Sequence, residues 1–491
     1  MCIRDRRITH GSVTNQDTGI QRVEFNNELI TNVLIAENEE FHIFEDGISL
    51  NQSFSLLPDS QEVKAGSVEY TSFNPNIATV GKYTGIATPV KGIYGTAIII
   101  AKSDGYSSII RVSIKPQDTD DVKSVAKPMV ATGASHTIAL KYDGTVWTWG
   151  NNTNGQLGNN STENSSSPVQ VKSADGNRYL TNIIEISAGS DHNMALRNDG
   201  TVWTWGSNAY GQLGNGSSVN SMLPVQVKST DGNSFLTDVV QISAGYVHSM
   251  ALKKDGTVLA WGRNDGGQLG NNNTSNKSLP VQVKGGASGS EYLTDVVQVT
   301  AGNWHSMALK ANGTVYAWGW GQYGQLGNGY TTNSDDSDRY SYEKIYSAPV
   351  QVLNGAQTSE TGYLKEVVQI DAMGGTGRSE SNRFGTSLAV TESKEVYGWG
   401  NSLYGALGVK SSIVSTPVRV ATGISTAVQV AGGGKSGSDD WHVNNIGNTG
   451  YTYILKEDGT VSSLGYNVNG ELGNGAQTST INVQEVSNLT K

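Results

Sequence analysis

Short runs of alternating apolar and polar residues recur along most of this chain and predict β-strands. One stretch contains four such runs in succession: Ile183 to Ser187, Asn193 to Arg197, Thr201 to Trp205 and Pro224 to Val227. Alternation with a period of two is typical of strands. Apolar residues do not line up at helical spacing over any long segment. The pattern therefore predicts an all-β protein.

This stretch is one copy of a long repeat. Tryptophans at equivalent positions follow one another at intervals of 56, 56 and 57 residues: Trp149, Trp205, Trp261 and Trp318. The phrase from His136 to Gly158 recurs almost letter for letter three times, and two looser copies follow, the last with Leu464 at the tryptophan position. The pair Asp143-Gly144 and its equivalents predict two-residue hairpins in which both central residues have positive φ. Six units of four strands predict a β-propeller.

The constant positions of the repeat are Gly, His, Ala-Leu, Asp-Gly-x-Val, Trp-Gly and Gly-Gln-Leu-Gly. This pattern resembles the repeat of the regulator of chromosome condensation family over residues 122 to 491, and we assign residues 124–491 to such a propeller. The family builds seven blades, whereas six copies are visible here. Either a seventh repeat lies beyond the C-terminus, or the ring closes at six. In the second case Val483 to Val486 would supply a strand to the first copy, which starts at Ser124 to Val130.

A second unit precedes the propeller, over residues 21–115, with a polar linker at 116–123. Its phrase Tyr70 to Val80 resembles the group 2 bacterial immunoglobulin-like domain, with Tyr70 in place of the usual tryptophan. The apolar runs Ala97 to Ala101 and Ile109 to Ile114 fit strands of a β-sandwich. Residues 1–20 resemble translated linker or an incomplete upstream segment. The resemblance of residues 21–115 to the immunoglobulin-like domain implies a spacer of the kind found in surface or secreted proteins. We therefore expect an extracellular or cell-surface location, although no signal peptide is visible.

Composition excludes several classes of function. The formal net charge is −10 and no Lys/Arg cluster is present, which argues against a nucleic-acid partner. No run of about 18 apolar residues indicates a membrane span. Gly319, Gly321 and Gly324 spell a dinucleotide fingerprint but lack the helix that it requires, so we predict no cofactor. No catalytic motif is visible, and we predict a monomer that is not an enzyme.

The histidines at one repeat position raise the question of metal binding. These are His136, His192, His248 and His305, with His442 loosely equivalent. Neighbouring blades would hold them farther apart than the bonds of about 2 Å that one zinc ion makes. We therefore favour a structural role in the turn over metal capture or pH sensing, and we predict no metal site.

The copies differ at positions that are candidates for binding. Tyr246 and Trp304 precede the histidine on two blades, and Trp320 and Tyr323 lie in or beside the loop after Trp-Gly. Aromatic side chains on loops are common in binding hot spots, although partial burial against the next blade explains them equally well.

Three insertions interrupt the repeat. The first, Gly329 to Ser347, contains acidic and tyrosine residues suited to calcium or a basic partner, or simply to a solvated loop: Asp335, Asp336, Asp338, Tyr340 and Tyr342. The second and third, Met373 to Gly385 and Gly434 to Gly450, interrupt the same Gly-to-His loop and so are expected on one face. The third contains a cluster that we select as a binding site: Asp439, Asp440, Trp441 and His442.

These observations favour a non-catalytic binding scaffold, in which the N-terminal unit holds out a propeller that binds a protein or a glycan. An alternative rests on the family resemblance, because the member that gives the family its name promotes nucleotide exchange on a small GTPase. A second alternative, a propeller enzyme, would need converging carboxylates that the sequence does not display.

Overall fold

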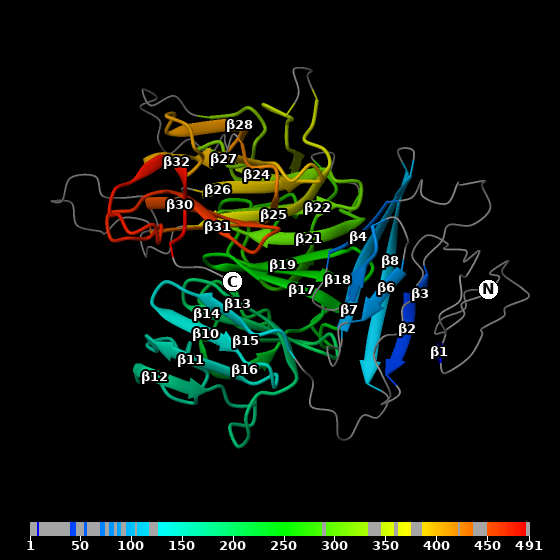
Figure 1. The fold of residues 1–491 in the computed structure, drawn as a ribbon. Helices are drawn as coiled ribbons and strands as arrows, with labels where there is room; N and C mark the ends of the chain where they lie inside the picture. The colour runs from blue at the N-terminus through cyan, green and yellow to red at the C-terminus, as the bar shows by residue number, and fades with distance from the viewer. Residues whose placement is uncertain are drawn as a thin grey trace, which may run out of the picture.

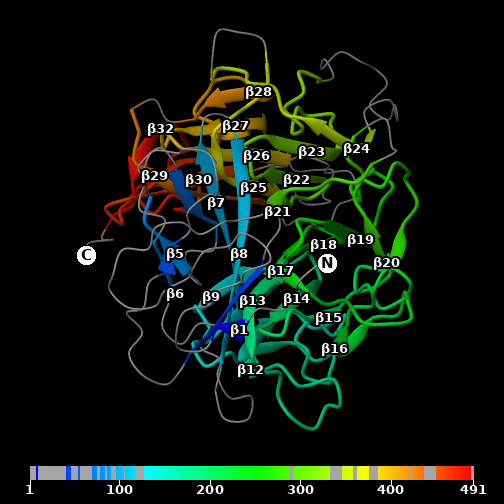
Figure 2. The same cartoon turned by 90° about the vertical axis from the view of Figure 1, so that its right-hand side faces the viewer.

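The computed structural model describes residues 7–8, 40–45, 54–55, 69–73, 78–82, 86–89, 95–103, 106–116, 126–286, 291–331, 345–357, 362–374, 385–420, 423–435 and 449–487. From residue 126 onward the chain forms six four-stranded antiparallel sheets, which are the blades of a β-propeller. Figures 1 and 2 show the blades following one another in chain order around a common centre. Among the described residues, no helix is long and apolar enough to cross a membrane.

Each blade is built from four consecutive strands, numbered from the centre outward. Blades 1 and 2 contain β9 (Met129–Thr132), β10 (His136–Leu140), β11 (Val146–Gly150) and β12 (Ser165–Gln170), then β13 (Ile183–Ala188), β14 (His192–Arg197), β15 (Val202–Gly206) and β16 (Ser221–Gln226). Blades 3 and 4 contain β17 (Val239–Ala244), β18 (His248–Lys253), β19 (Val258–Gly262) and β20 (Lys277–Gln282), then β21 (Val296–Ala301), β22 (His305–Lys310), β23 (Val315–Trp320) and β24 (Ile345–Gln351).

The last two blades follow the same plan despite their looser sequences. They contain β25 (Val367–Gly374), β26 (Gly385–Thr391), β27 (Val396–Asn401) and β28 (Ile413–Arg419), then β29 (Ala427–Lys435), β30 (Thr449–Lys456), β31 (Val461–Gly465) and β32 (Thr480–Glu485). The predicted all-β propeller of four-stranded blades is thus confirmed, with six blades.

The exchange of a strand between the chain ends, which the sequence left open as one of two alternatives, does not occur among the described residues. The first blade has its own outer strand, β12, which pairs with β11. The segment proposed to complete it overlaps β32 and pairs with β31 in the sixth blade. The error came from placing the Pro-Val-Gln-Val run before its blade, whereas the structure places this run last in each blade.

The hairpins between second and third strands also differ from the prediction. In the first blade Leu140 pairs with Val146, and Lys141 N donates to Thr145 O while Gly144 N donates to Lys141 O. Only the glycine has positive φ, 72°. The turn is therefore a three-residue loop ending in a left-handed glycine. Asp143 accepts from Thr145 N, which explains why Asp or Asn precedes the glycine.

The N-terminal residues form two further sheets. One has the order β1-β2-β8-β7-β4 and the other β3-β6-β5, from strands β1 (Arg7–Ile8), β2 (Glu40–Glu45), β3 (Phe54–Ser55), β4 (Glu69–Ser72), β5 (Ala78–Val80), β6 (Ile86–Pro89), β7 (Gly95–Ser103) and β8 (Tyr106–Pro116). Tyr70 and Ile99 are buried. The assignment of this unit to the immunoglobulin-like class stays a prediction.

Candidate binding face

One face of the propeller brings loops from all blades to the centre. Because the strands of a blade alternate in direction, the loops from first to second strand and from third to fourth strand emerge on the same side, which we call the axial face. A cavity of about 300 Å³ opens there, lined mainly by the last residues of the first strands and the loops that follow them. The sequence enters the propeller from the opposite side, where β9 begins.

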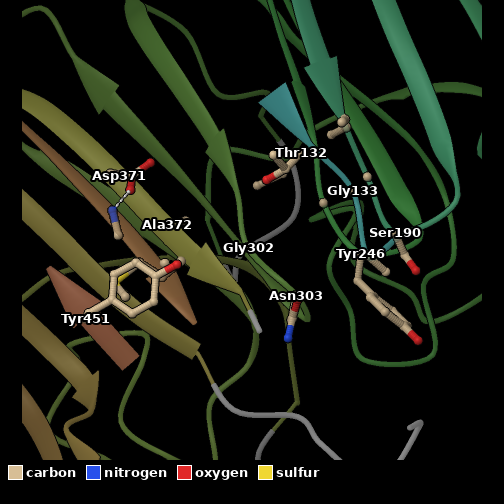
Figure 3. Close-up of a pocket in the computed structure, with 18 residues that line it drawn as sticks. Thr132, Gly133, Ser190, Tyr246, Gly302, Asn303, Asp371, Ala372 and Tyr451 are labelled. Atoms are coloured by element: carbon tan, nitrogen blue, oxygen red, sulfur yellow. Dashed lines mark hydrogen bonds between the residues drawn. The ribbon is translucent and has the colours of Figure 1, made fainter. Parts of the chain in front are cut away.

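Each blade contributes at least one polar side chain to this cavity. Figure 3 shows them arranged around the opening: Thr132, Ser190, Tyr246, Asn303, Asp371 and Tyr451. The remaining lining is largely glycine and alanine, which leaves the cavity open. Side chains of five residue types, on first and second strands and on the loops between them, therefore surround the cavity.

The histidine of the repeat connects one blade to the next. In the second blade His192 Nε2 lies 3.0 Å from Ser249 Oγ of the third blade, and Ser249 in turn donates to Gln212 O at 2.9 Å. His248 and His305 make the same contact with Ser306 and Ser387, and in the first blade His136 instead contacts Asn193 Oδ1, so the first four blades are each linked to their successors. Because the serine hydroxyl donates to the carbonyl, the imidazole must donate from Nε2.

The glycine three residues before the histidine is required by the same relay. A Cβ atom at Gly189 would lie 2.1 Å from His192 Cε1, and the corresponding atoms at Gly133 and Gly245 would lie 2.2 Å from their own histidines. No side chain fits at that distance. The contacts of the Gly-x-x-His segment therefore support a structural role for the repeated histidine.

Burial keeps these histidines neutral. It lowers the pKa of His192, His248 and His305 to about 3 and lowers that of His136 in the same direction. Within the described part of the chain, no three His, Cys, Asp or Glu side chains converge on a point where a metal ion could bind. The register places Tyr451, not His442, at the histidine position of the sixth blade, since Tyr451 pairs with Gly465 as His192 pairs with Gly206.

Two buried carboxyl groups lie on first strands but do not converge. Burial raises the pKa of Glu185, in the second blade, to about 8 and that of Asp371, in the fifth, to about 6. Each accepts a hydrogen bond from a backbone N–H of the following blade, at Ile242 and Gly432 respectively. They act as bridges between blades, which is not the arrangement of an acid and base pair.

Most of the predicted aromatic residues pack within the propeller. Trp304 and Trp320 are only 1% and 2% exposed, and Tyr323 is half-buried. The guanidinium of Arg263 stacks 4.4 Å from the Trp304 ring and 4.5 Å from the Tyr210 ring, and it pairs with Asp265. Burial favours the packing interpretation for the two tryptophans. Tyr246, in contrast, lines the axial cavity.

All three insertions join strand ends on the axial face, between β23 and β24, β25 and β26, and β29 and β30. Their candidate residues lie outside the described residues: Asp335, Asp336, Asp338, Tyr340, Tyr342, Asp439, Asp440, Trp441 and His442. Their role in binding stays a prediction, and so does calcium binding.

The sequence reasoning missed most of the cavity. Ser190 and Asn303 occupy the same variable position as Tyr246, two residues before the histidine, but they are small and drew no attention. Asp371 could have been found by comparing the copies. It is a charged residue, whereas the second to fourth copies have an uncharged hydroxyl residue at the same position: Ser187, Ser243 and Thr300.

Comparison with known proteins agrees with this geometry. The RCC1-like domain profile matches residues 110–491. The chain belongs to the RCC1-like domain family. It is 28% identical to the Ultraviolet-B receptor UVR8 of Arabidopsis thaliana over 378 residues, which is 71% of this chain and 78% of the receptor. It is 30% identical to the human E3 ubiquitin-protein ligase HERC2 over 61% of this chain but only 5% of that protein, and 33% identical to Protein pim1 of Schizosaccharomyces pombe over 43% of this chain and 42% of pim1.

Solved structures show the same fold for this RCC1-like chain. Human WBSCR16 aligns with a TM-score of 0.54 at 19% identity, covering 86% of this chain and 93% of that one. Yeast RCC1 (Prp20), in its complex with Kap60, aligns with a TM-score of 0.53 at 20% identity, covering 74% and 75% of the two chains.

Proposed function

We propose that this RCC1-like propeller is a non-catalytic binding scaffold and that its axial face contacts a partner protein. The observation that carries the proposal is the set of polar or aromatic side chains, of five residue types and at least one from each blade, that surround a cavity in an otherwise repeated framework. A repeated fold does not require such variety. Binding to an irregular surface does, because each contact must match a different group of the partner.

Two further observations support a protein as the partner. All three insertions connect strand ends on the axial face. Solved relatives with this fold include yeast RCC1 bound to Kap60, and Prp20p described with its binding properties to Gsp1p and histones. A glycan partner, and display at a cell surface on the N-terminal unit, remain predictions from the sequence.

The test compares substitutions on the two faces. Tyr246→Ala combined with Asn303→Ala should weaken binding of a partner by about tenfold or more, because both side chains line the cavity. Tyr142→Ala is the matched control, since this exposed tyrosine lies in the β10–β11 turn on the opposite face. Deletion of residues 436–448 should also abolish capture of the partner. Equal binding by all variants would show that the axial face is not the binding surface.

Nucleotide exchange on a small GTPase is a second candidate, favoured by the shared fold with yeast Prp20p and its described binding to Gsp1p. The assay is release of a fluorescent guanine nucleotide from a panel of GTPases in the presence of this chain. We expect no acceleration, because no recognisable exchange wedge is visible in the sequence. Acceleration that the Tyr246→Ala, Asn303→Ala variant loses would replace the scaffold proposal by an exchange factor.

A further inference from the structure

The axial cavity has one charged side chain among its described lining residues, Asp371 of β25 in the fifth blade. The other lining side chains are hydroxyl, amide, phenol, thioether or methyl groups, and the remaining residues are glycines. Figure 3 shows Asp371 and Tyr451 on one side of the cavity, and Thr132 and Tyr246 on the other. At about 300 Å³, the cavity lies at the lower end of the range for ligand pockets, so it suits a single side chain better than a whole cofactor.

The other copies of the repeat show that the joint between first strands does not need a charge at this position. In three of them a neutral hydroxyl oxygen accepts a hydrogen bond from a backbone N–H of the next first strand, at 2.9 to 3.1 Å: Ser187, Ser243 and Thr300. Asp371 makes the equivalent bond with one carboxylate oxygen, Oδ2, which lies 2.9 Å from Gly432 N. This hydrogen bond therefore does not explain why the fifth copy has a carboxylate.

The negative charge of Asp371 has no counter-ion within the described part of the chain. Its hydrogen-bond donors there are the backbone N–H groups of Gly432 and Ala372. A carboxylate has about four acceptor sites, so about two remain for another donor. Burial of an unpaired charge is unfavourable, and it raises the pKa of Asp371 to about 6, which still leaves most of the carboxyl groups ionised at pH 7.5.

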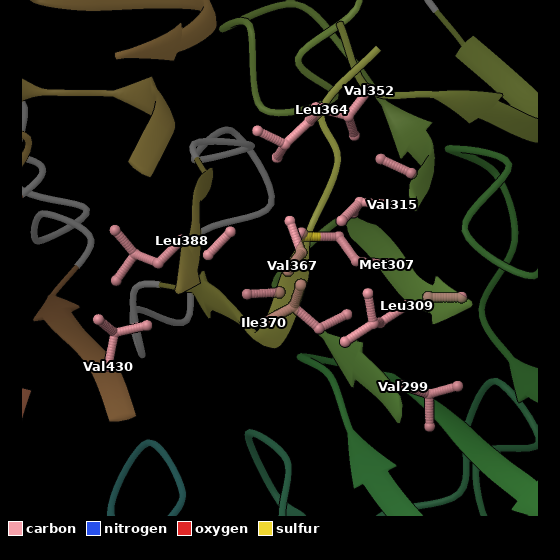
Figure 4. Packing of buried hydrophobic residues seen from close by; sticks show 14 of the residues in the cluster. Val299, Met307, Leu309, Val315, Val352, Leu364, Val367, Ile370, Leu388 and Val430 are labelled. Atoms are coloured by element: carbon pink, nitrogen blue, oxygen red, sulfur yellow. The ribbon is translucent and has the colours of Figure 1, made fainter. Parts of the chain in front are cut away.

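The strand that carries this carboxylate is anchored in the core. Ile370, which precedes Asp371, and Val430 on the neighbouring first strand are each 1% exposed and belong to the apolar cluster in Figure 4. Ile370 N also donates to Gln298 Oε1 at 2.9 Å. Asp371 is therefore fixed beside the cavity, and a ligand would meet a site that is already formed.

We propose that the axial cavity binds a cationic side chain of the partner protein, the ammonium of a lysine or the guanidinium of an arginine, with Asp371 as its counter-ion. The inference rests on the scaffold function proposed above, because both place the partner on the axial face. The cation would donate charge-assisted hydrogen bonds to the remaining acceptor sites of the carboxylate. The ring of Tyr451 lines the same cavity, and aromatic rings attract cations. The formal net charge of −10 also favours the approach of a basic partner.

The first measurement uses small cationic probes. Nα-acetyl-lysine methylamide and Nα-acetyl-arginine methylamide are each titrated into the full chain at pH 7.5 and low salt, and binding is followed by saturation-transfer difference NMR. The tighter of the two identifies the preferred cation. Asp371→Asn keeps an acceptor oxygen for Gly432 N but removes the charge, and it should weaken binding of that probe at least tenfold. The uncharged norleucine analogue should not bind.

Glu185→Gln is the matched control. Glu185 is the other buried carboxyl group on a first strand, but it does not line the cavity, so this variant should bind the probes as the wild type does. Equal binding by wild type and Asp371→Asn, or binding of neither probe by the wild type, would overturn the proposal.

The chain itself contains basic residues that follow cavity-lining segments in the sequence, namely Arg378, Arg383 and Lys435. A variant with glutamine at all three positions tests whether one of them is the occupant. Probe binding that appears only in this variant would mean that a side chain of the same molecule fills the cavity, which would also overturn the proposal.

The stability of the unliganded protein provides a second measurement. Asp371→Ser introduces the residue that two other copies have at this position, so it keeps an acceptor for Gly432 N and removes the unpaired charge. We expect its melting temperature at pH 7.5 to rise by about 2 °C. A lower melting temperature for both Asp371→Ser and Asp371→Asn would show that the joint itself requires the carboxylate, and this result would overturn the proposal.

Capture of the partner separates this inference from the scaffold function. Asp371→Asn should weaken capture at least tenfold, as it weakens binding of the probe. If the Tyr246→Ala, Asn303→Ala variant loses capture while Asp371→Asn retains it, the axial face binds the partner without a cation in the cavity. In that case the scaffold function stands and the cationic ligand is wrong.

Discussion

The third-strand tryptophan of the first blade has a different environment from its four equivalents, although its local sequence is nearly the same. Trp205, Trp261, Trp318 and Trp399 are fully buried and donate to a carbonyl of the preceding blade. Trp149 is half-buried, and its indole makes no such bond to the described residues. Local sequence could not predict the difference, because Trp149 and Trp205 stand in the same Val-Trp-Thr-Trp-Gly phrase and only the neighbouring blade distinguishes them.

This difference predicts unequal effects of one substitution. Trp261→Phe should lower the free energy of unfolding by about 1–3 kcal/mol, because it removes the donor to Gln212 O in a dry joint. Trp149→Phe should change it by less than about 0.5 kcal/mol. Urea unfolding followed by circular dichroism measures both. Equal losses would contradict the weaker contacts of Trp149.

The buried histidines predict a loss of stability in acid. Their folded-state pKa of about 3 lies below the ordinary 6.5, so the unfolded chain binds protons between these values and the folded chain does not. Stability therefore falls as pH drops below 6.5, by up to about 1.4 kcal/mol per pH unit for each histidine.

His248→Gln should keep a hydrogen-bond donor to Ser306. The variant should lose the contribution of one titrating histidine to the pH dependence of stability. Between pH 6.5 and pH 4.5, the unfolding free energy of the wild type should therefore fall by more than that of the variant. Urea titrations at both pH values provide the measurement. Parallel pH profiles would show that His248 titrates normally in the folded protein.

At the level of elements, glutamine side chains connect the first strand of one blade to the first strand of the next. Gln241, Gln298 and Gln369 each accept from a backbone N–H of the next first strand at 2.9 Å. In the second blade, alternation predicted the bounds of the first three strands to within one residue, whereas the outer strand begins three residues before the predicted Pro224. The partner of each glutamine could not be predicted, because it depends on which blade lies beside it. The wrong outer-strand assignment has the same cause, since a Pro-Val-Gln-Val run fits the start or the end of a blade equally well.

In the second blade, Glu185 occupies the position of these glutamines. We therefore predict that replacing it by glutamine stabilises the protein by an amount that depends on pH. Its folded-state pKa of about 8 exceeds the ordinary 4.5, so its contribution to stability is complete below pH 4.5 and is lost as pH rises through 8. Glu185→Gln should therefore raise the melting temperature at pH 9 more than at pH 5. Scanning calorimetry at the two pH values measures the change. An equal or opposite change would mean that Glu185 is ionised without penalty.

For the whole molecule, the unequal burial of the second strands predicts a gradient of stability from the central blades to the end blades. The second strands β14, β18 and β22 are buried on both sides, whereas β10 alternates between buried and half-buried residues because one side lacks a neighbour. Amide hydrogen exchange measured by mass spectrometry should be slower in β18 and β22 than in β10 and β30. Uniform protection across all six blades would indicate that the propeller opens only as one unit.

Because each of the six blades is made from contiguous sequence, and the described strands include none exchanged between the first and last blades, a nascent chain need not wait for its last residues before it acquires structure. Each blade can fold as soon as its four strands have left the ribosome, and the next blade can then pack against it.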